Sequence, residues 1–346
     1  MRRWLVAGAA ATAGAWAWTR WMDGRNSRIA RPPVRDPDGR PYPVRRFQHS
    51  DGEEVEVHVV GRGPTVLLLP GADGIKETWR YQVPALASRY RVIAPDLRSS
   101  FPPGAGFERL AADALELLDA YGYGQAIVVG QSLGGAIAMR LAAGAPGSVA
   151  ALVLANTLAH VGYEHVGLNR TLLVPVAMAT TRYLPTGLSR AAARLWSRLD
   201  VWIYDSSPGG GRVVDYALRT GPRTVLPSVS GARVKLLKRE DLRPELPAIE
   251  APAIVVKGPR DRYTPPSWAR EIAALIPGAR YVELDGTGHC SHISMPGSFN
   301  RLVLEWLDAV AGPEQAIDAS PGRGQAIDAG FPESAAPAGA SEEGCA

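Results

Sequence analysis

The hydrophobic residues of this 346-residue chain fall into short runs that are separated by glycine- and proline-containing turns. Some runs are apolar throughout, such as Thr65–Leu69, which is typical of a parallel strand covered on both faces. Others alternate, as in Glu54–Val60, where Val55, Val57 and Val59 share one face. The pattern predicts eight strands, at residues 45–49, 54–60, 65–69, 91–94, 126–129, 150–155, 253–257 and 280–284.

Helical patterns alternate with these strands, at residues 78–89, 107–121, 133–143, 266–275 and 298–311. Two antiparallel-looking strands followed by β-α repeats predict an α/β protein with a doubly wound, mostly parallel sheet. The repeat stops after Asn156 and returns at Ala253. We therefore expect a core formed by residues 47–156 and 251–311. The helix-like segment 157–250 between them is expected to be a lid inserted above the sheet.

The N-terminal residues 1–22 contain an uncharged run from Trp4 to Thr19, with tryptophans at both ends. This pattern favours a signal peptide or an uncleaved membrane anchor, and the alternatives are a mispositioned start or an alanine-rich helix packed on the domain. The arginines that follow the run outnumber those before it, which slightly favours the cytoplasmic face; a cleaved segment would imply secretion. Residues 23–46 are expected to be an extended linker.

Charge is distributed unevenly along the chain. Residues 1–46 hold ten Arg and three acids, whereas the whole chain has a net charge of only +4. The basic character therefore belongs to the N-terminal segment and does not indicate nucleic-acid binding. Residues 312–346 are rich in Ala, Gly, Pro, Ser and Glu and are expected to be a disordered tail. The two cysteines, Cys290 and Cys345, do not suggest a disulfide framework.

The stretch 126–143 carries the strongest chemical signal. A β-branched run leads into Gly130-Gln131-Ser132-Leu133-Gly134, and a helical pattern follows. A serine at a sharp strand-to-helix turn is held in a strained conformation that exposes its Oγ at the sheet edge, and the flanking glycines avoid collisions. The motif alone is weak evidence, but its context predicts that Ser132 is a nucleophile.

A serine nucleophile needs a base and a carboxylate that orients the base. Of the six histidines, His289 follows the last predicted strand, and Asp261 follows the strand 253–257. Both are expected at the same sheet edge as Ser132, because functional groups gather at the carboxyl ends of parallel strands. Asn156 follows a neighbouring strand but lacks a charge, and His292 is interpreted as structural. Asp96, which follows another strand before the serine, is interpreted as bracing its loop.

An oxyanion hole requires two backbone N–H donors. The expected donors are Leu133, directly after the nucleophile, and Ala72 in the loop that follows the strand 65–69. Gly71 permits a tight approach of that loop.

These pieces together resemble the α/β-hydrolase superfamily, in particular its lidded esterases, lactonases and cofactor-free haloperoxidases. The matching segments are LLLPG (67–71), VIAPDLR (92–98), GQSLGG (130–135), KGPRDRYTP (257–265), and GTGHCSH followed by PGSFN (286–300). The resemblance implies the α/β-hydrolase fold and a hydrolytic triad of Ser132, Asp261 and His289 with no cofactor or metal. Relatives that open epoxides or cleave carbon–halogen bonds use an aspartate nucleophile, and Ser132 argues against those activities.

Two loops depart from the family pattern. The oxyanion loop usually begins His-Gly, but here it begins Pro70-Gly71, and the loop after Asp96 lacks the usual Arg-Gly-x-Gly-x-Ser. Maspardin-like members, which act more as binding proteins, lose the same motifs. The first hypothesis is a serine hydrolase for a small lipophilic ester, thioester or lactone, tethered to a membrane by its N-terminal segment. The alternatives are a membrane-tethered binding or scaffold protein and a cofactor-free haloperoxidase.

Overall fold

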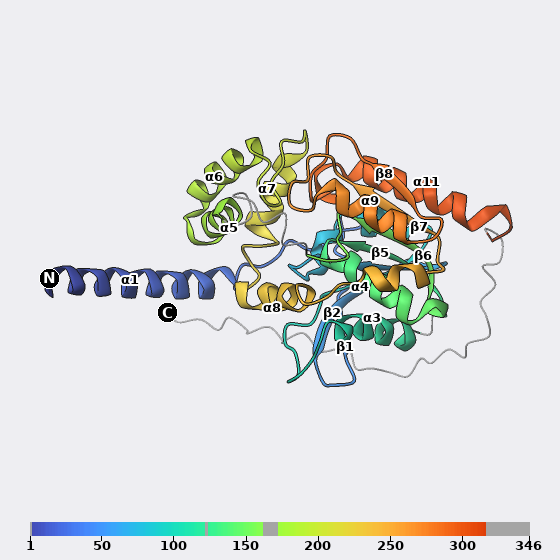
Figure 1. The fold of residues 1–346 in the computed structure, drawn as a ribbon, viewed down its shortest axis with the longest axis horizontal. Helices are drawn as coiled ribbons and strands as arrows, with labels where there is room; N and C mark the ends of the chain where they lie inside the picture. Colours follow the sequence, from blue (N-terminus) through green and yellow to red (C-terminus); the bar gives the residue numbers. More distant parts are fainter. Residues whose placement is uncertain (1, 122–123, 162–171, 316–346) are drawn as a thin grey trace, which may run out of the picture.

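The computed structural model describes residues 2–121, 124–161 and 172–315 (Figure 1). Its sheet has eight strands in the order β1-β2-β4-β3-β5-β6-β7-β8. The strands are β1 (Arg45–Gln48), β2 (Glu54–Val60), β3 (Thr65–Leu69), β4 (Arg91–Pro95), β5 (Ala126–Gln131), β6 (Val149–Ala155), β7 (Ala253–Lys257) and β8 (Arg280–Glu283). The first two pair antiparallel, and all later pairs are parallel. The predicted fold class, an α/β-hydrolase sheet, is confirmed.

The strand order reverses around β3. The chain passes from β3 to β4 on one side and then to β5 on the other side of β3. A doubly wound sheet opens a crevice at such a switch point, at the carboxyl ends of its strands. The loop after β3 and the turn after β5 therefore face each other across the place where a ligand is expected.

Two layers of helices bury the two faces of the sheet. The helices on one face of the sheet contribute side chains such as Leu110, Ile137 and Trp268 to a common core with the strands. The helices on the other face contribute side chains such as Val83 and Trp306 to a second core cluster with the strands. The first layer consists of α3 (Glu108–Ala120), α4 (Leu133–Gly144) and α9 (Pro266–Leu275), and the second of α2 (Gln82–Ala87) and α11 (Pro296–Gln315). The central strands β3 and β7 are buried along their whole length, as their apolar sequences predict.

The predicted helix 78–89 is wrong as a single element. The structure contains a 3-10 turn, η1 (Lys76–Trp79), followed by the short helix α2. Pro84 explains the break, because in a continuous helix its ring would collide with the carbonyl group four residues earlier. As the third residue of α2, Pro84 lies in the first turn, where its missing N–H group needs no helical acceptor.

In its described residues, the segment predicted as a lid contains four α-helices and a buried cluster of its own. This cluster includes Trp202, Tyr204 and Val213 and reaches Ile75 and Ile293 of the core. The helices are α5 (Val174–Tyr183), α6 (Thr186–Arg198), α7 (Gly210–Arg219) and α8 (Pro227–Leu237). In Figure 1, α5, α6 and α7 form one group beside the sheet, and α8 lies near the end of the N-terminal helix.

The N-terminal segment forms the long helix α1 (Arg2–Asn26), which projects from the rest of the protein (Figure 1). Its C-terminal end packs on α5: the Trp18 Nε1 donates to the Tyr183 carbonyl at 3.0 Å, and Met22 is buried. Within the described part of the chain, no helix combines the length and the apolarity that crossing a membrane requires. At the other terminus, α11 continues to Gln315, past the predicted helix end, and the rest of the predicted tail lies outside the described residues.

Candidate active site

Ser132 occupies the sharp turn between β5 and α4. Its backbone has φ 54° and ψ −118°, a conformation that is strained for a residue with a side chain. The surrounding structure holds it: the Ser132 amide donates to the Ala155 carbonyl at 3.0 Å, and the Thr157 Oγ1 donates to the Ser132 carbonyl at 2.6 Å. The turn therefore has the geometry that the glycine-flanked serine motif predicts.

The two flanking glycines are required by close packing. A Cβ atom on Gly130 would lie 2.3 Å from the Gly134 carbonyl oxygen, and one on Gly134 would lie 2.0 Å from the Leu69 carbonyl oxygen. These are backbone atoms of neighbouring elements, which cannot move without displacing β3 or α4. The glycines thus allow the first turn of α4 to approach the loop that follows β3.

The predicted acid and base meet at the same sheet edge. The His289 Nδ1 lies 3.0 Å from the Asp261 Oδ2, and both side chains are buried. The Tyr263 and Thr264 amides donate to the Asp261 Oδ1 at 2.8 Å and 3.0 Å. Burial alone would raise the Asp261 pKa, but the charges of His289 and Lys257 hold it well below its ordinary value. Asp261 is therefore ionised and accepts a hydrogen bond from the His289 Nδ1.

Lys257 is a site residue that sequence reasoning missed. It is fully buried at the end of β7, and its Nζ lies 2.5 Å from the Asp261 Oδ2 and 3.0 Å from the Thr264 Oγ1. Burial lowers its pKa, while the attraction of Asp261 opposes that shift. Its position directly before a glycine at the end of an apolar strand was the available signal.

A hydrogen bond joins the residue before the serine to the backbone of the histidine. The Gln131 Nε2 donates to the His289 carbonyl at 3.1 Å. Among the described residues, no hydrogen bond joins the Ser132 Oγ to the His289 ring. Both side chains are nearly closed off, with 8% of Ser132 and 4% of His289 exposed. Catalytic hydrogen bonds often tighten only when substrate binds, so a serine–histidine bond is not required in the unliganded protein.

The two predicted oxyanion donors lie at the switch point of the sheet. Leu133 is the first residue of α4, where the amide has no intrahelical acceptor. Ala72 belongs to the loop after β3, and the Gly71 carbonyl oxygen in that loop accepts from the Gly74 amide at 2.8 Å. Since the C=O and N–H groups of a trans peptide point in opposite directions, this bond fixes the direction of the Ala72 amide.

A second carboxyl group, missed by sequence reasoning, lies in the oxyanion loop. Asp73 accepts a hydrogen bond from the Tyr216 hydroxyl of α7 at 2.9 Å. Burial raises the pKa of Asp73 to about 6, against the opposing effects of the Tyr216 hydrogen bond and the charges of Arg233 and His289. Charge at this position therefore changes within the physiological pH range.

The other residues considered in the sequence have structural contacts. The Asn156 Oδ1 accepts from the Gly258 amide at 2.7 Å, which ties β6 to β7. The His292 Nε2 lies 3.1 Å from the Thr78 Oγ1, and burial lowers the His292 pKa to about 3, so that its ring is neutral. The Asp96 Oδ1 accepts from the Lys76 amide at 2.7 Å, as a loop-bracing carboxylate does. Of the other histidines, His165 lies outside the described residues.

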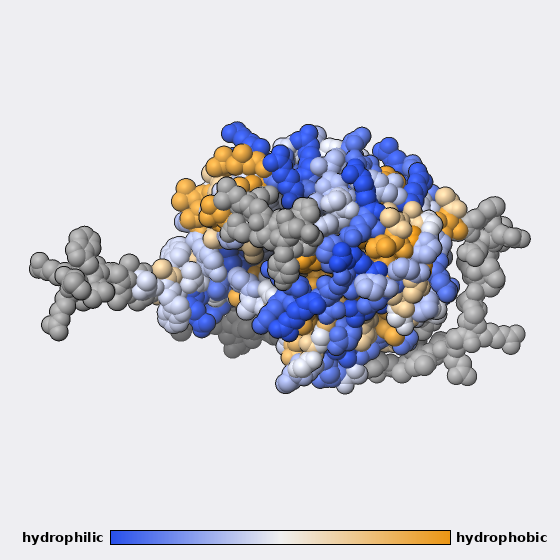
Figure 2. Space-filling view, viewed as in Figure 1, coloured by the Kyte–Doolittle hydropathy of each residue, from blue (hydrophilic) through white to orange (hydrophobic). Residues whose placement is uncertain are grey.

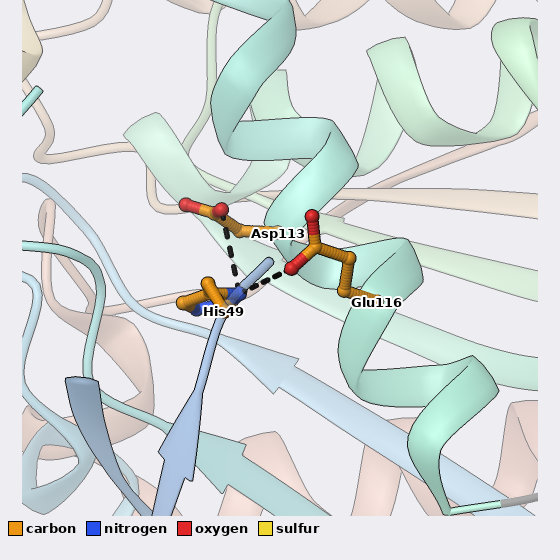
Figure 3. Close-up of side chains that lie close together, drawn as sticks. All are labelled: His49, Asp113 and Glu116. Atoms are coloured by element: carbon orange, nitrogen blue, oxygen red, sulfur yellow. Dashed lines mark hydrogen bonds and ion pairs between the residues drawn. The ribbon is translucent and has the colours of Figure 1, made fainter. Parts of the chain in front are cut away.

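A separate cluster of His49, Asp113 and Glu116 has side chains that point toward one another (Figure 3). The His49 Nδ1 lies 3.0 Å from the Glu116 Oε2 and 3.4 Å from the Asp113 Oδ1. Both carboxylates also pair with arginines: Arg98 with Asp113 at 2.6 Å, and Arg109 with each of them at 2.5 Å. Because two cations already occupy this cluster, we interpret it as an ion-pair network that joins β1 to α3.

A cleft of about 190 Å³ opens on the outer side of the oxyanion loop. Asp73, Gly74 and Arg233 line it together with Ser27 and Arg31 from the segment after α1. Ser132 and His289 do not line this cleft. This cleft therefore lies where the loop after β3 meets α8 and the segment after α1.

Comparison with known proteins identifies the family. The sequence pattern of the alpha/beta hydrolase fold family matches residues 64–296. The chain therefore belongs to the α/β-hydrolase family.

Curated relatives and solved structures agree with this assignment and place the chain among hydrolases. The magnesium-chelatase 30 kDa subunit of Rhodobacter capsulatus is 29% identical, over 71% of this chain and 87% of that protein. A pimeloyl-[acyl-carrier protein] methyl ester esterase of Nitrosomonas europaea is 30% identical, over 71% and 96%. The polyketide synthase ThaQ of Burkholderia thailandensis is 31% identical over 74% of this chain, which spans only 12% of that much longer protein.

Two crystal structures show the same fold. The enol-lactonase from Burkholderia xenovorans is 25% identical, with a TM-score of 0.56 over 76% of this chain and 99% of that one. A non-heme bromoperoxidase from Mycobacterium tuberculosis is 26% identical, with a TM-score of 0.62 over 75% and 97%.

Proposed function

We propose that this protein is a serine hydrolase that cleaves a carboxylic ester, thioester or lactone through an acyl-enzyme. The observation that carries the proposal is the His289–Asp261 pair at the sheet edge where Ser132 occupies its strained turn. Similarity to an esterase and to an enol-lactonase supports the reaction class.

In the first half-reaction, the Ser132 Oγ attacks the acyl carbon, and its proton passes to the His289 Nε2. The carbonyl π electrons move to the oxygen, where the Ala72 and Leu133 amides stabilise the developing negative charge. The intermediate collapses as the bond to the leaving oxygen or sulfur breaks, and His289 returns the proton to that atom. In the second half-reaction, water replaces the alcohol or thiol, and the same steps release the acid and free Ser132.

A lipophilic substrate fits the surroundings of the triad. Cys290, which follows His289, belongs to the same buried apolar cluster as Trp202 and Tyr204 of the lid. Burial and the nearby carboxylates raise the pKa of the Cys290 thiol, so that it stays protonated and does not compete as a nucleophile. An acyl or alcohol chain that enters beneath the lid would therefore contact hydrocarbon groups.

The experiment is hydrolysis of a series of p-nitrophenyl esters by the full chain, with Ser132→Ala, His289→Ala and the control Ser88→Ala at an exposed position of the surface. We expect turnover by the wild type and the control, and loss of about 10⁴-fold or more in the two site variants. No ester turnover by the wild type would favour the binding or scaffold alternative. Turnover that persists in Ser132→Ala would assign a different nucleophile.

We also propose that the surface of α1, α5 and α6 contacts a membrane containing anionic lipids. The exposed apolar side chains of this surface are Trp16, Trp18, Trp21, Val176, Met178, Leu188, Leu195 and Leu199. Apolar residues gather over α5 and α6 in Figure 2. Exposed arginines on the same helices, among them Arg20, Arg194 and Arg198, complement anionic headgroups.

Flotation with vesicles tests this surface. The full chain is expected to bind vesicles of phosphatidylcholine with about a quarter phosphatidylglycerol, and to be released as the salt concentration rises. Trp18→Ser combined with Leu195→Ser should weaken binding, whereas the control Leu226→Ser, at an exposed position outside this surface, should not. Equal binding by both variants, or no binding by the wild type, would contradict the proposal.

A further inference from the structure

The lid sends one buried arginine into the loops around the oxyanion hole. Arg233, on α8, donates from Nη1 to the Ala72 and Asp73 carbonyls at 3.1 Å and 2.9 Å. Its Nη2 donates to the Leu97 and Arg98 carbonyls, both at 2.8 Å, and its Nε donates to the Arg98 carbonyl at 3.0 Å. A single guanidinium group thus joins the loop after β3 to the loop after β4.

All five of these hydrogen bonds end on backbone carbonyl groups. The side chain is almost fully buried, and burial lowers its pKa to about 10, so that it stays protonated at neutral pH. The charges of Asp73 and Asp96 act in the opposite direction, but neither carboxylate is a hydrogen-bond acceptor for Arg233 in the described contacts. A buried cation that is devoted to backbone carbonyls is suited to fixing the path of a loop, because each bond sets one peptide plane.

The oxyanion loop is shaped to receive this guanidinium. Gly74 has φ +63°, and a Cβ atom there would lie 2.2 Å from the Arg233 Nη1. The Gly74 carbonyl also accepts from the Leu97 amide at 2.9 Å, so the two loops bond to each other beside the arginine. A side chain at position 74 would disfavour this positive φ angle, and it would occupy the space that the Arg233 guanidinium fills.

These contacts determine the direction of the predicted oxyanion donor. The Ala72 residue is held on both sides: the preceding carbonyl, of Gly71, bonds to the Gly74 amide, and its own carbonyl bonds to Arg233. The two loops concerned are those in which the sequence departs from the family pattern, with Pro70 in place of histidine and Ser99 in place of the glycine that usually follows the arginine. Arg233 of the lid therefore supports, through its hydrogen bonds, two loops that lack the usual family motifs.

We propose that Arg233 is a positioning residue that aligns the Ala72 amide for the oxyanion, so that a complete oxyanion hole forms only when α8 of the lid is seated on the core. This inference rests on the proposed hydrolase function. Arg233 does not touch the substrate; it acts through the Ala72 and Asp73 peptide planes. The Tyr216 hydroxyl, which donates to Asp73, gives the lid a second contact with the same loop. Displacement of the lid would therefore reduce transition-state stabilisation as well as expose the crevice.

The test compares Arg233→Lys and Arg233→Met with Lys235→Met, a control at an exposed position of the same helix. Lysine keeps the charge but cannot reach four carbonyls in a fixed planar arrangement. Steady-state kinetics with p-nitrophenyl esters should show kcat lowered about 10- to 100-fold in Arg233→Lys and more in Arg233→Met, with KM changed less than about threefold. The inhibition constant of a trifluoromethyl ketone, whose adduct places an oxyanion in the hole, should rise in proportion to the loss of kcat.

The outcomes separate this inference from the proposed function. Absence of ester turnover in the wild type would overturn both. An active wild type with Arg233 variants that retain kcat within about threefold would overturn only the positioning role. The positioning role would also be overturned if KM rises without a loss of kcat, or if ketone affinity is unchanged. Loss of the cooperative melting transition in both variants would overturn it as well, because Arg233 would then have a purely structural role.

Discussion

Two regions meet at the carboxyl edge of the sheet, and they are built in different ways. The triad edge, which comprises Ser132, Asp261 and His289, is specified by short motifs that each follow a strand. The lid junction, which comprises Asp73, Tyr216 and Arg233, brings together residues about 140 to 160 positions apart through single side chains. In the proposed mechanism, the first region carries the reactive groups, and the second holds the loop that completes the oxyanion hole. From this comparison we infer that a contact from elsewhere in the chain offsets the departure of these loops from the family motif.

The largest expected effect belongs to the triad edge. Asp261→Asn should lower kcat about 10⁴-fold, because the amide would favour the wrong tautomer of His289 and would not stabilise its cation. Lys257 would also lose its charged partner, so we expect a lower melting temperature. Kinetics and thermal melting of the same sample check both results. A loss of kcat no greater than that of the Arg233 variants would remove the distinction between the two regions.

His292 is buried near the triad edge, and its substitution tests the stability of this region rather than its chemistry. Its ring is neutral in the folded protein, with its pKa lowered by burial and by the charge of His289. The unfolded chain takes up a proton near pH 6.5, so stability that is complete above that pH is lost as the pH falls toward 3. The loss should reach up to about 4 kcal/mol. Urea unfolding of His292→Gln should depend less on pH between 6.5 and 4; an identical slope in both proteins would contradict this role.

The smallest expected effect is the change in stability on substitution of Asp73, which tests the lid junction. Its pKa is raised by burial to about 6, so ionisation costs stability above the unfolded pKa near 4, and the cost grows until the pH passes 6. Asp73→Asn keeps an acceptor for the Tyr216 hydroxyl and should stabilise the protein by about 1–2 kcal/mol at pH 8 but not at pH 4. Denaturant unfolding at both pH values measures this. Destabilisation at pH 8 would show that the charge supports the junction.

The sequence predicted the triad edge and most of the sheet because their signals are local. The motif around Ser132 and the positions of Asp261 and His289 after strands depend on residues that are adjacent in the chain. The predicted helix 78–89 is wrong because Pro84 is not compatible with the interior of a continuous helix.

The lid junction could not be predicted in this way. A guanidinium that joins carbonyls of two loops has no sequence pattern, since any arginine in the lid segment could do so. Tyr216 has no such pattern either, because its role depends on which carboxylate the fold places beside it. Such contacts are visible only once the lid is placed on the core.

The central claim is that Ser132 is the nucleophile of an assembled triad and oxyanion hole. Intact-mass measurement after incubation with a fluorophosphonate, followed by peptide mapping, tests it most directly. We predict one phosphonyl group per wild-type chain, located on the peptide that contains Ser132, none on Ser132→Ala, and slower labelling of Arg233→Lys than of Lys235→Met. An unlabelled wild-type chain, or a label that persists in Ser132→Ala, would contradict the account.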